Sequence, residues 1–187
     1  CELFLPGHGF PIIGKTRIKL ALETTSSFLR TIEDQTLKLM NQGKSLNQVL
    51  HEVEIPENLM NHAWLTPIYD DPQFLIRMIW RRYGGWWDGE YDRLLPSPRK
   101  AEAIAWVELS GGIENIISKA LEQSNQENYA VAAHLIETAF HADHSNEKAH
   151  KARSEIYRKF SLKQSSSMGR NILNHASLAS MKGLRDM

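Results

Sequence analysis

The stretch Asn128–Phe160, with the sequence NYAVAAHLIETAFHADHSNEKAHKARSEIYRKF, predicts two consecutive helices joined by a short polar turn. Apolar residues recur there at spacings of three and four, which places them on one face of each helix. They are Ala132, Leu135, Ala139 and Ala142 in the first helix and Ala149, Ala152 and Ile156 in the second. Because most of these side chains are small, the stretch indicates closely packed helices as the basic unit of the fold.

The turn between these helices resembles the one in tetratricopeptide repeats, where Asp-Pro-x-Asn precedes an Ala-rich helix. Here the turn is Asp143-His144-Ser145-Asn146, so a histidine stands in place of the proline. Only about one and a half repeats are visible, whereas a peptide-binding solenoid needs about three to bury its faces. Packing within a helical bundle is therefore the favoured interpretation, and a tetratricopeptide-like protein-interaction module is the alternative.

Helical periodicity also covers the chain upstream of this stretch. A long amphipathic helix is predicted from Lys15 to Gly43, with its apolar positions at Ile18, Leu22, Leu29, Ile32 and Leu39. The capping-box pattern Ser45-Leu-Asn-Gln48 predicts the start of a second helix. Asp71-Pro72 predicts the start of a third, whose apolar face would consist of Leu75, Met78, Ile79 and Tyr83.

The two ends of the chain complete the predicted architecture. Further helices are expected at Pro98–Ser110, Ile113–Ser124 and Met168–Met181. Residues 1–14 differ, because a short apolar run is followed by Pro6-Gly-His-Gly-Phe-Pro11, which predicts a strand and a tight loop. The predicted fold class is therefore all-α, a multi-helix bundle with a tetratricopeptide-like segment, preceded by a short strand-loop stub. Pro96-Ser-Pro98 predicts a subdivision near residues 96–98.

The composition narrows the class of protein. Apolar residues make up 42% and charged residues 24% of the 187 positions, which is typical of a soluble globular protein. Lys+Arg and Asp+Glu number 22 each, so we expect neither a nucleic-acid partner nor binding to an anionic membrane. No apolar run reaches the ~18 residues of a membrane span. Zero net charge also favours self-association.

His8, between two glycines on the predicted loop, is the position where chemistry is most plausible. A neutral imidazole on a rigid loop is a common zinc ligand, and the flanking glycines let other groups approach closely. Taken alone, such a histidine is more often structural. His141 and His144, at a helix end, and the pair Asp70-Asp71, at a helix start, are interpreted as terminal residues rather than metal ligands.

Several motifs in a fixed order give a resemblance to a known family. They are the His8 loop, Asp34-Gln-Thr36, Asn41-Gln-Gly43, Arg82-Tyr-Gly-Gly-Trp-Trp-Asp-Gly89, Leu95-Pro-Ser-Pro98 and Gly111-Gly112. Together they resemble the alkyl sulfatases of the metallo-β-lactamase superfamily. The family pattern is approximately Tyr-Leu-Gly-Trp/Tyr-Phe/Tyr-Asp-Gly. The corresponding segment here is Tyr83-Gly-Gly-Trp86-Trp87-Asp88-Gly89. The resemblance extends from His8 to about residue 184.

The resemblance implies that the chain contains parts of two different domains. Residues 1–14 would be the carboxyl-terminal remnant of a metallo-β-lactamase-like catalytic domain, and residues 15–187 a helical alkyl sulfatase dimerisation domain that forms a homodimer. The abrupt apolar start at Cys1 is interpreted in the same way, as a truncated amino terminus. The parent enzyme would hydrolyse alkyl sulfate or related esters with zinc-bound hydroxide. The sequence leaves the cellular compartment of the parent open, and a periplasmic or secreted enzyme would agree with it.

The resemblance also implies roles for individual residues. His8 would be one zinc ligand in the intact parent enzyme. The His-x-His-x-Asp-His cluster that supplies most ligands in the superfamily is absent from these 187 residues. A competent site needs three or more protein ligands, so the fragment is expected to bind no zinc and to be inactive by itself. A chain that is active as it stands is the competing hypothesis.

Tyr83, Trp86 and Trp87 are the candidate substrate-binding residues. Their rings would suit an alkyl chain as one wall of the substrate channel in the intact enzyme. The alternative is that they lie in the core or at the dimer interface. Two adjacent tryptophans on extended backbone cannot both point into one core, so exposure or an interface is expected for at least one of them.

Overall fold

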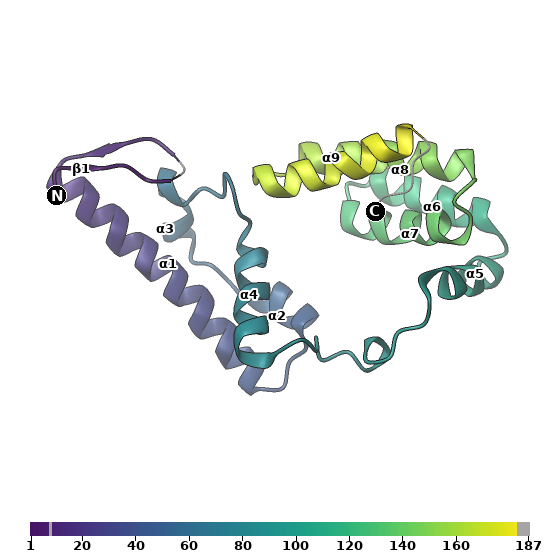
Figure 1. Cartoon of the computed structure of the whole chain (residues 1–187), viewed down its shortest axis with the longest axis horizontal. Coiled ribbons are helices and arrows are strands. Elements are labelled where there is room, and N and C mark those ends of the chain that lie inside the picture. Colours follow the sequence, from purple (N-terminus) through teal and green to yellow (C-terminus); the bar gives the residue numbers. More distant parts are fainter. Residues whose placement is uncertain (8, 183–187) are drawn as a thin grey trace. The chain divides into compact units, whose positions relative to one another are not determined.

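The computed structural model describes residues 1–7 and 9–182. These residues form an amino-terminal unit, Cys1–Leu95, and a carboxyl-terminal unit that begins at Pro96, each with its own hydrophobic core. Apart from a two-stranded hairpin, the regular structure of both units is helical, as Figure 1 shows. The predicted all-α class with a strand-loop stub is therefore confirmed.

The amino-terminal unit begins with a hairpin that leads directly into a long helix. Strands β1 (Leu3–Phe4) and β2 (Ile12–Ile13) pair antiparallel, with Leu3 opposite Ile13. Gly14, which has a φ of +98°, then connects β2 to α1 (Lys15–Asn41). In Figure 1 the hairpin lies at the amino-terminal end of α1, while α2 and α4 lie near its other end. The helix ends where Gly43 adopts a φ of +76°.

Shorter helical elements follow α1 in the amino-terminal unit. They are α2 (Leu46–Glu52), α3 (Glu57–Met60), the 3₁₀ turn η1 (Ala63–Leu65), α4 (Pro72–Gly84) and the 3₁₀ turn η2 (Tyr91–Arg93). Among them, α2, η1 and α4 pack against α1. The predicted capping box is confirmed, because the Ser45 hydroxyl accepts from Gln48 N and Ser45 N donates to Gln48 Oε1 at 2.9 Å. The predicted cap of α4 is also confirmed, since Asp71 Oδ1 accepts from Gln73 N at 2.9 Å.

The buried faces of α1 and α4 differ from the predicted ones. In α1 the structure buries Ile18 and Ile32 as expected, but Leu22 and Leu29 are about half exposed, at 51% and 46%. In α4 the prediction of Met78 and Tyr83 as core residues was wrong, because Ile76 and Trp80 are buried instead. Trp80 belongs to the same buried cluster as Phe28 and Ile32 of α1, and it donates from Nε1 to Trp87 O at 2.8 Å.

The carboxyl-terminal unit is a bundle of five consecutive described helices. They are α5 (Arg99–Leu109), α6 (Ile113–Asn125), α7 (Tyr129–Ala142), α8 (Glu147–Leu162) and α9 (Ser167–Met181). The small residues predicted to face inward do so, since Ala132, Ala139, Ala149 and Ile156 are each 0% exposed. Because these side chains are short, α6, α7 and α8 pack closely around one apolar cluster.

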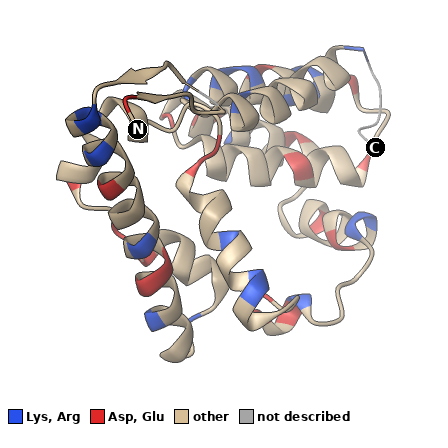
Figure 2. Cartoon of the chain, turned by 60° about the vertical axis from the view of Figure 1, so that its left-hand side comes forward, with Lys and Arg blue, Asp and Glu red and all other residues tan. Residues whose placement is uncertain are grey.

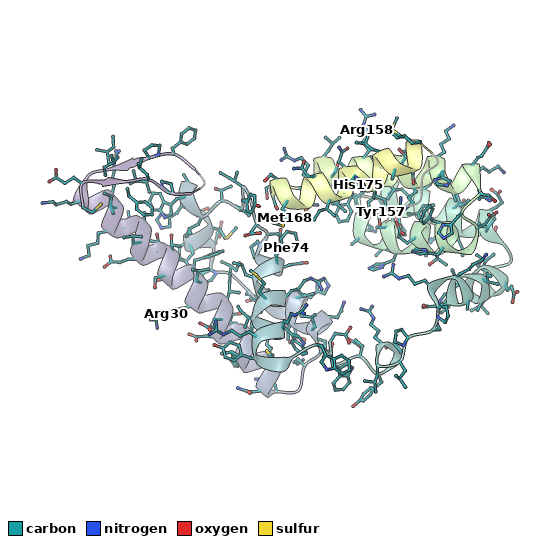
Figure 3. All side chains as sticks on the ribbon, viewed as in Figure 1. Arg30, Phe74, Tyr157, Arg158, Met168 and His175 are labelled. Carbon is teal, nitrogen blue, oxygen red and sulfur yellow. The ribbon has the colours of Figure 1, made fainter. Side chains whose placement is uncertain are left out.

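An ion pair lies inside this bundle. Arg153 of α8 donates from Nε to Glu137 Oε1 of α7 at 2.6 Å, and from Nη1 to Ser180 Oγ of α9 at 2.9 Å. Its guanidinium lies over two aromatic rings, 4.3 Å from the centroid of Phe140 and 5.0 Å from that of Tyr157, which Figure 3 labels. Arg153 therefore ties three helices together.

The surface carries charges of both signs. Lys and Arg are interspersed with Asp and Glu along the helices, as Figure 2 shows. A mixed pattern of this kind creates no single dominant field. Within residues 1–7 and 9–182, none of the helices combines the length and the apolarity that crossing a lipid bilayer requires.

Candidate functional site

The loop predicted to carry the chemistry joins β1 to β2. Its histidine, His8, lies outside the described residues, so its role as a metal ligand stays a prediction. The residues on both sides are described, and Gly9 has a φ of +101°, which L side chains rarely adopt. Pro6, Gly9, Phe10 and Pro11 all line an apolar pocket in the amino-terminal unit. The described residues of this loop therefore contribute to the lining of a cavity.

This pocket is formed by three segments that are distant in sequence. It has a volume of about 560 Å³, within the range of about 300–1,000 Å³ that is typical of ligand sites. One wall is the hairpin, a second is α1, and the third is the segment from η1 to the start of α4. The lining side chains are mostly apolar and include Phe4, Phe10, Ile12, Leu22, Phe28, Leu29, Trp64, Leu65, Ile68, Tyr69 and Leu75.

Polar contacts hold the third wall of the pocket against α1. Trp64 Nε1 donates to the Thr24 hydroxyl at 2.9 Å, and the Trp64 ring stacks on His62 with 4.9 Å between centroids. The Thr24 hydroxyl in turn donates to Leu20 O at 2.7 Å, so it is fixed on the helix. Because Trp64 is held from both sides, this wall presents a defined apolar surface.

The lining fits an apolar ligand better than a charged one. The two carboxylates at the pocket belong to Asp70 and Asp71, and that of Asp71 already caps α4. Hydroxyl groups come from Thr25, Thr66 and Tyr69. A long aliphatic chain would bury its methylene groups here at a gain of about 0.8 kcal/mol each. The sequence analysis did not predict the pocket. Its available signal was the pair Leu22 and Leu29, which lie seven residues apart on one face of α1 and both line the pocket.

The three predicted substrate-binding residues lie elsewhere in the same unit, and none of them is among the described residues that line the pocket. Tyr83 is half exposed, and its hydroxyl donates to Glu33 Oε1 of α1 at 2.9 Å. Trp86 is 79% exposed. Trp87 is partly buried, and its Nε1 donates to Glu90 O at 3.2 Å. The structure thus brings Trp87 towards the core and leaves Trp86 on the surface.

The described residues offer no group of three ligands that could accompany His8 at a metal ion. Across residues 1–7 and 9–182, no group of three His, Cys, Asp or Glu side chains is arranged to hold a metal ion. His141 and His144 do lie near each other, with 5.6 Å between ring centroids. His141 Nε2 lies 3.4 Å from Glu137 Oε2 and 3.4 Å from Arg99 Nη1, which is a polar cluster next to a buried ion pair.

The fold and the pocket together define a class of protein, a two-unit helical domain with a hairpin and an apolar pocket at its amino-terminal end. A family model described as alkyl sulfatase dimerisation matches residues 45–183. The chain therefore belongs to the alkyl sulfatase dimerisation family. The resemblance stated from the sequence motifs is confirmed by this match.

The relatives of the chain are themselves much longer. It is 26% identical over 159 residues to a linear primary-alkylsulfatase of Pseudomonas sp. (strain ATCC 19151), covering 84% of this chain and 30% of the relative. It is 24% identical over 170 residues to an alkyl/aryl-sulfatase of Saccharomyces cerevisiae, covering 91% of this chain and 26% of that protein. The chain thus spans less than a third of the curated relatives it matches.

Solved structures share the fold. The stereoselective inverting sec-alkylsulfatase Pisa1 from Pseudomonas sp. matches with a TM-score of 0.90 over 98% of this chain and 29% of its own. The sequence identity in that match is 21%. A double mutant of the same sulfatase matches equally well, covering 99% of this chain. The likeness at this level of identity concerns the arrangement of the helices and the hairpin.

Proposed function

We propose that this chain is the helical dimerisation part of a zinc-dependent alkyl-sulfatase-like hydrolase, and that two copies of it form a homodimer. The observation that carries the proposal is the alkyl sulfatase dimerisation family match over residues 45–183. The agreement of the fold with solved sec-alkylsulfatase chains supports it. A net charge of zero removes long-range repulsion between two copies, which also favours pairing.

The proposed reaction of the whole enzyme is hydrolysis of a sulfuric ester. The relatives are alkylsulfatases by name, and the chain spans about a quarter to a third of each of them. Zinc, when bound, would supply a hydroxide that is nucleophilic at neutral pH. His8 is the proposed ligand from this chain. The described residues do not by themselves build a zinc site, so the other ligands would come from outside this chain, and the chain alone would be inactive.

The apolar pocket is the proposed place for the alkyl part of the substrate. Pro6, Gly9, Phe10 and Pro11 of the loop that carries His8 contribute to its lining, so a chain bound there would lie against this loop. Its aromatic and aliphatic walls match a hydrocarbon and offer little to a charged group. Tyr83, Trp86 and Trp87 as a second substrate wall stay a prediction, because the described pocket does not include them.

Two other functions compete with this proposal. One is a tetratricopeptide-like interaction module with no hydrolase role, built from the helices of the carboxyl-terminal unit. A chain that is catalytic as it stands would bind zinc without further segments. The polar turn Asp143–Asn146 is the feature that favours the first, since Asp143 Oδ1 accepts from Ser145 N at 2.9 Å and Asn146 caps α8 through Ala149 N at 2.9 Å.

Sedimentation equilibrium of the 187-residue chain tests the pairing. We expect a mass twice the 21.4 kDa of one chain at micromolar concentration, with a buried interface of at least about 1,000 Å². A chain that stays monomeric at the highest soluble concentration would overturn the dimerisation proposal.

Zinc content and sulfate release test the chemistry. The longer protein that contains these residues is expected to bind zinc, and the variant His8→Ala is expected to lose metal as measured by atomic emission. The same protein is expected to release sulfate from a long-chain alkyl sulfate. Zinc bound firmly to the 187-residue chain alone would instead support the hypothesis that it is active as it stands.

A further inference from the structure

We propose that Trp86–Leu95, named here the aromatic arm, is the part of the amino-terminal unit that contacts the second copy of the chain. The inference rests on the proposed function, because it assigns a surface to the proposed homodimer. The arm shows an unusual combination of features. The backbone of the arm is fixed on the core of the unit, while its largest apolar side chains are exposed.

Two hydrogen bonds fix the first half of the arm on neighbouring helices. Asp88 O accepts from Leu46 N, in the first turn of α2, at 2.8 Å. Trp87 O accepts from Nε1 of Trp80, a buried residue of α4, at 2.8 Å. The backbone of Trp87 and Asp88 thus takes part in the packing of two helices, and this part of the arm is an ordered element of the unit.

Further contacts order the turn inside the arm. Asp88 Oδ1 accepts from Glu90 N at 3.0 Å, and Asp88 Oδ2 lies 3.5 Å from Arg93 Nη1. The Trp87 and Tyr91 rings lie 5.7 Å apart between centroids. Gly89 approaches α2 so closely that a Cβ placed on it would lie 3.0 Å from Ser45 Cα. Because the turn is already ordered, little conformational entropy would be lost when a partner binds it.

The side chains that leave this ordered turn are of the types that dominate protein interfaces. Trp86 is 79% exposed, Tyr91 84% and Leu95 89%, and Leu94 is 45% exposed. Trp and Tyr are enriched among interface residues whose truncation is most costly. Each buries about 150–250 Å² when it is covered. The two aromatic residues alone would supply roughly 300 Å² of the about 800 Å² that one partner contributes to a stable interface.

A second copy of the chain is the occupant that the comparisons favour. The arm lies entirely within residues 45–183, the segment that matches the dimerisation family. Other exposed apolar side chains of this unit include Ile68 and Met78 within that segment, whereas those of the hairpin and its loop, among them Phe10, lie outside it. Within the matched segment of this unit, the arm combines the most exposed large apolar side chains with a backbone fixed on α2 and α4, so we assign the pairing surface to the arm.

The double variant Trp86→Ala/Tyr91→Ala tests the proposal by sedimentation equilibrium of the full 187-residue chain. We expect the dimer dissociation constant to rise at least about 100-fold, because truncation of one such interface residue costs roughly 30-fold or more. Circular dichroism is expected to show an unchanged helix content, since both side chains are exposed. The matched control Phe10→Ala removes an aromatic ring that is 90% exposed outside the arm, and it is expected to leave the dissociation constant unchanged.

The possible outcomes distinguish a failure of the arm assignment from a failure of the dimerisation proposal. A wild-type chain that is monomeric would overturn the dimerisation proposal, and the arm assignment with it. A wild-type dimer that the double variant leaves intact would overturn the arm assignment alone. Hydrogen exchange gives an independent readout, because amides of residues 86–95 are expected to gain protection as the wild-type chain is concentrated through its dissociation constant. Unchanged exchange there would overturn the arm assignment.

Discussion

Arg153 and Glu137 form a charge pair inside the helical bundle, with 2.6 Å between Arg153 Nε and Glu137 Oε1. The arginine side chain is 4% exposed and the glutamate side chain 24%, so the pair spans the boundary between core and surface. Ala176 O accepts a further hydrogen bond from Arg153 Nη1 at 3.1 Å. The guanidinium therefore has partners on α7 and α9, and its removal would affect both contacts.

Replacement of this arginine is expected to destabilise the bundle. Arg153→Met should lower the free energy of unfolding by about 3 kcal/mol, because Glu137 then loses its charged partner at a partly buried position. Urea unfolding followed by circular dichroism measures the loss. The control Arg158→Met changes an exposed arginine on the same helix and should cost less than about 0.5 kcal/mol. Equal losses in both variants would mean that the buried pair contributes nothing beyond a surface charge.

Gly85 and Gly89 have the same backbone angle but different surroundings. Their alanine variants therefore distinguish the cost of backbone strain from the cost of a steric clash at the arm. Gly85 and Gly89 both have a φ of +85°, but only a Cβ on Gly89 would meet a neighbour within 4 Å, at Ser45 Cα. Gly85→Ala is expected to cost about 1 kcal/mol through the angle alone. Gly89→Ala should cost at least about 1 kcal/mol more and should also weaken the dimer. Thermal unfolding of the two variants measures the difference, and equal costs would mean that the backbone at Gly89 shifts freely.

The apolar pocket should bind an alkyl sulfate at concentrations below micelle formation. Leu29→Trp places a larger side chain on the wall of the pocket and is expected to weaken binding at least about tenfold, as measured by isothermal titration calorimetry. Leu20→Trp is the matched control, because Leu20 lies on the same helix, is exposed to the same degree at 45%, and does not line the pocket. Equal weakening in both variants would place the binding elsewhere on α1.

Acid should weaken the turn that precedes α8. Hydrogen bonds from the Ser145 hydroxyl and then from the Ser145 backbone N–H lower the pKa of Asp143. A carboxyl whose pKa is lowered by folding stabilises the protein fully above its unfolded pKa of about 4. That contribution is lost as the pH falls through the lower pKa of the folded state.

The variant Asp143→Asn isolates this effect. The difference in unfolding free energy between wild type and variant is expected to be largest above about pH 5 and to shrink as the pH falls below about 4. Urea unfolding at a series of pH values measures it. A difference that stays constant down to pH 2 would show that ionisation of Asp143 does not stabilise the turn.

Local features of the fold were predictable from the sequence. The caps at Ser45 and Asp71 and the inward-facing Ala149, Ala152 and Ile156 agree with the structure. Each depends on residues within one or two helical turns, so neighbours in the sequence suffice to specify them. The family resemblance was also readable, because it depends on motifs and their order. The role of His8 and the domain limits at residues 14 and 15 stay predictions.

Features that join distant segments were not predictable. The indole of Trp80 in α4 donates to the backbone of Trp87, and the side-chain amide of Gln35 in α1 pairs with the backbone of Glu54, 19 residues away, through both its oxygen and its nitrogen. No periodicity in either segment indicates these partners. The prediction for α4 was therefore wrong for Met78 and Tyr83, although Leu75 and Ile79 do pack against the core.

The helical class, the start of most helices and the family could all be inferred from the amino-acid sequence. The three-dimensional fold was needed to show that the exposed leucines of α1 line a pocket, and that Trp87 turns inward while the adjacent Trp86 stays outside. The two groups of features differ in the range of the interactions that produce them. Helix periodicity and caps are set within a few residues, whereas the pocket and the aromatic arm exist only where the hairpin, α1, α2 and α4 come together.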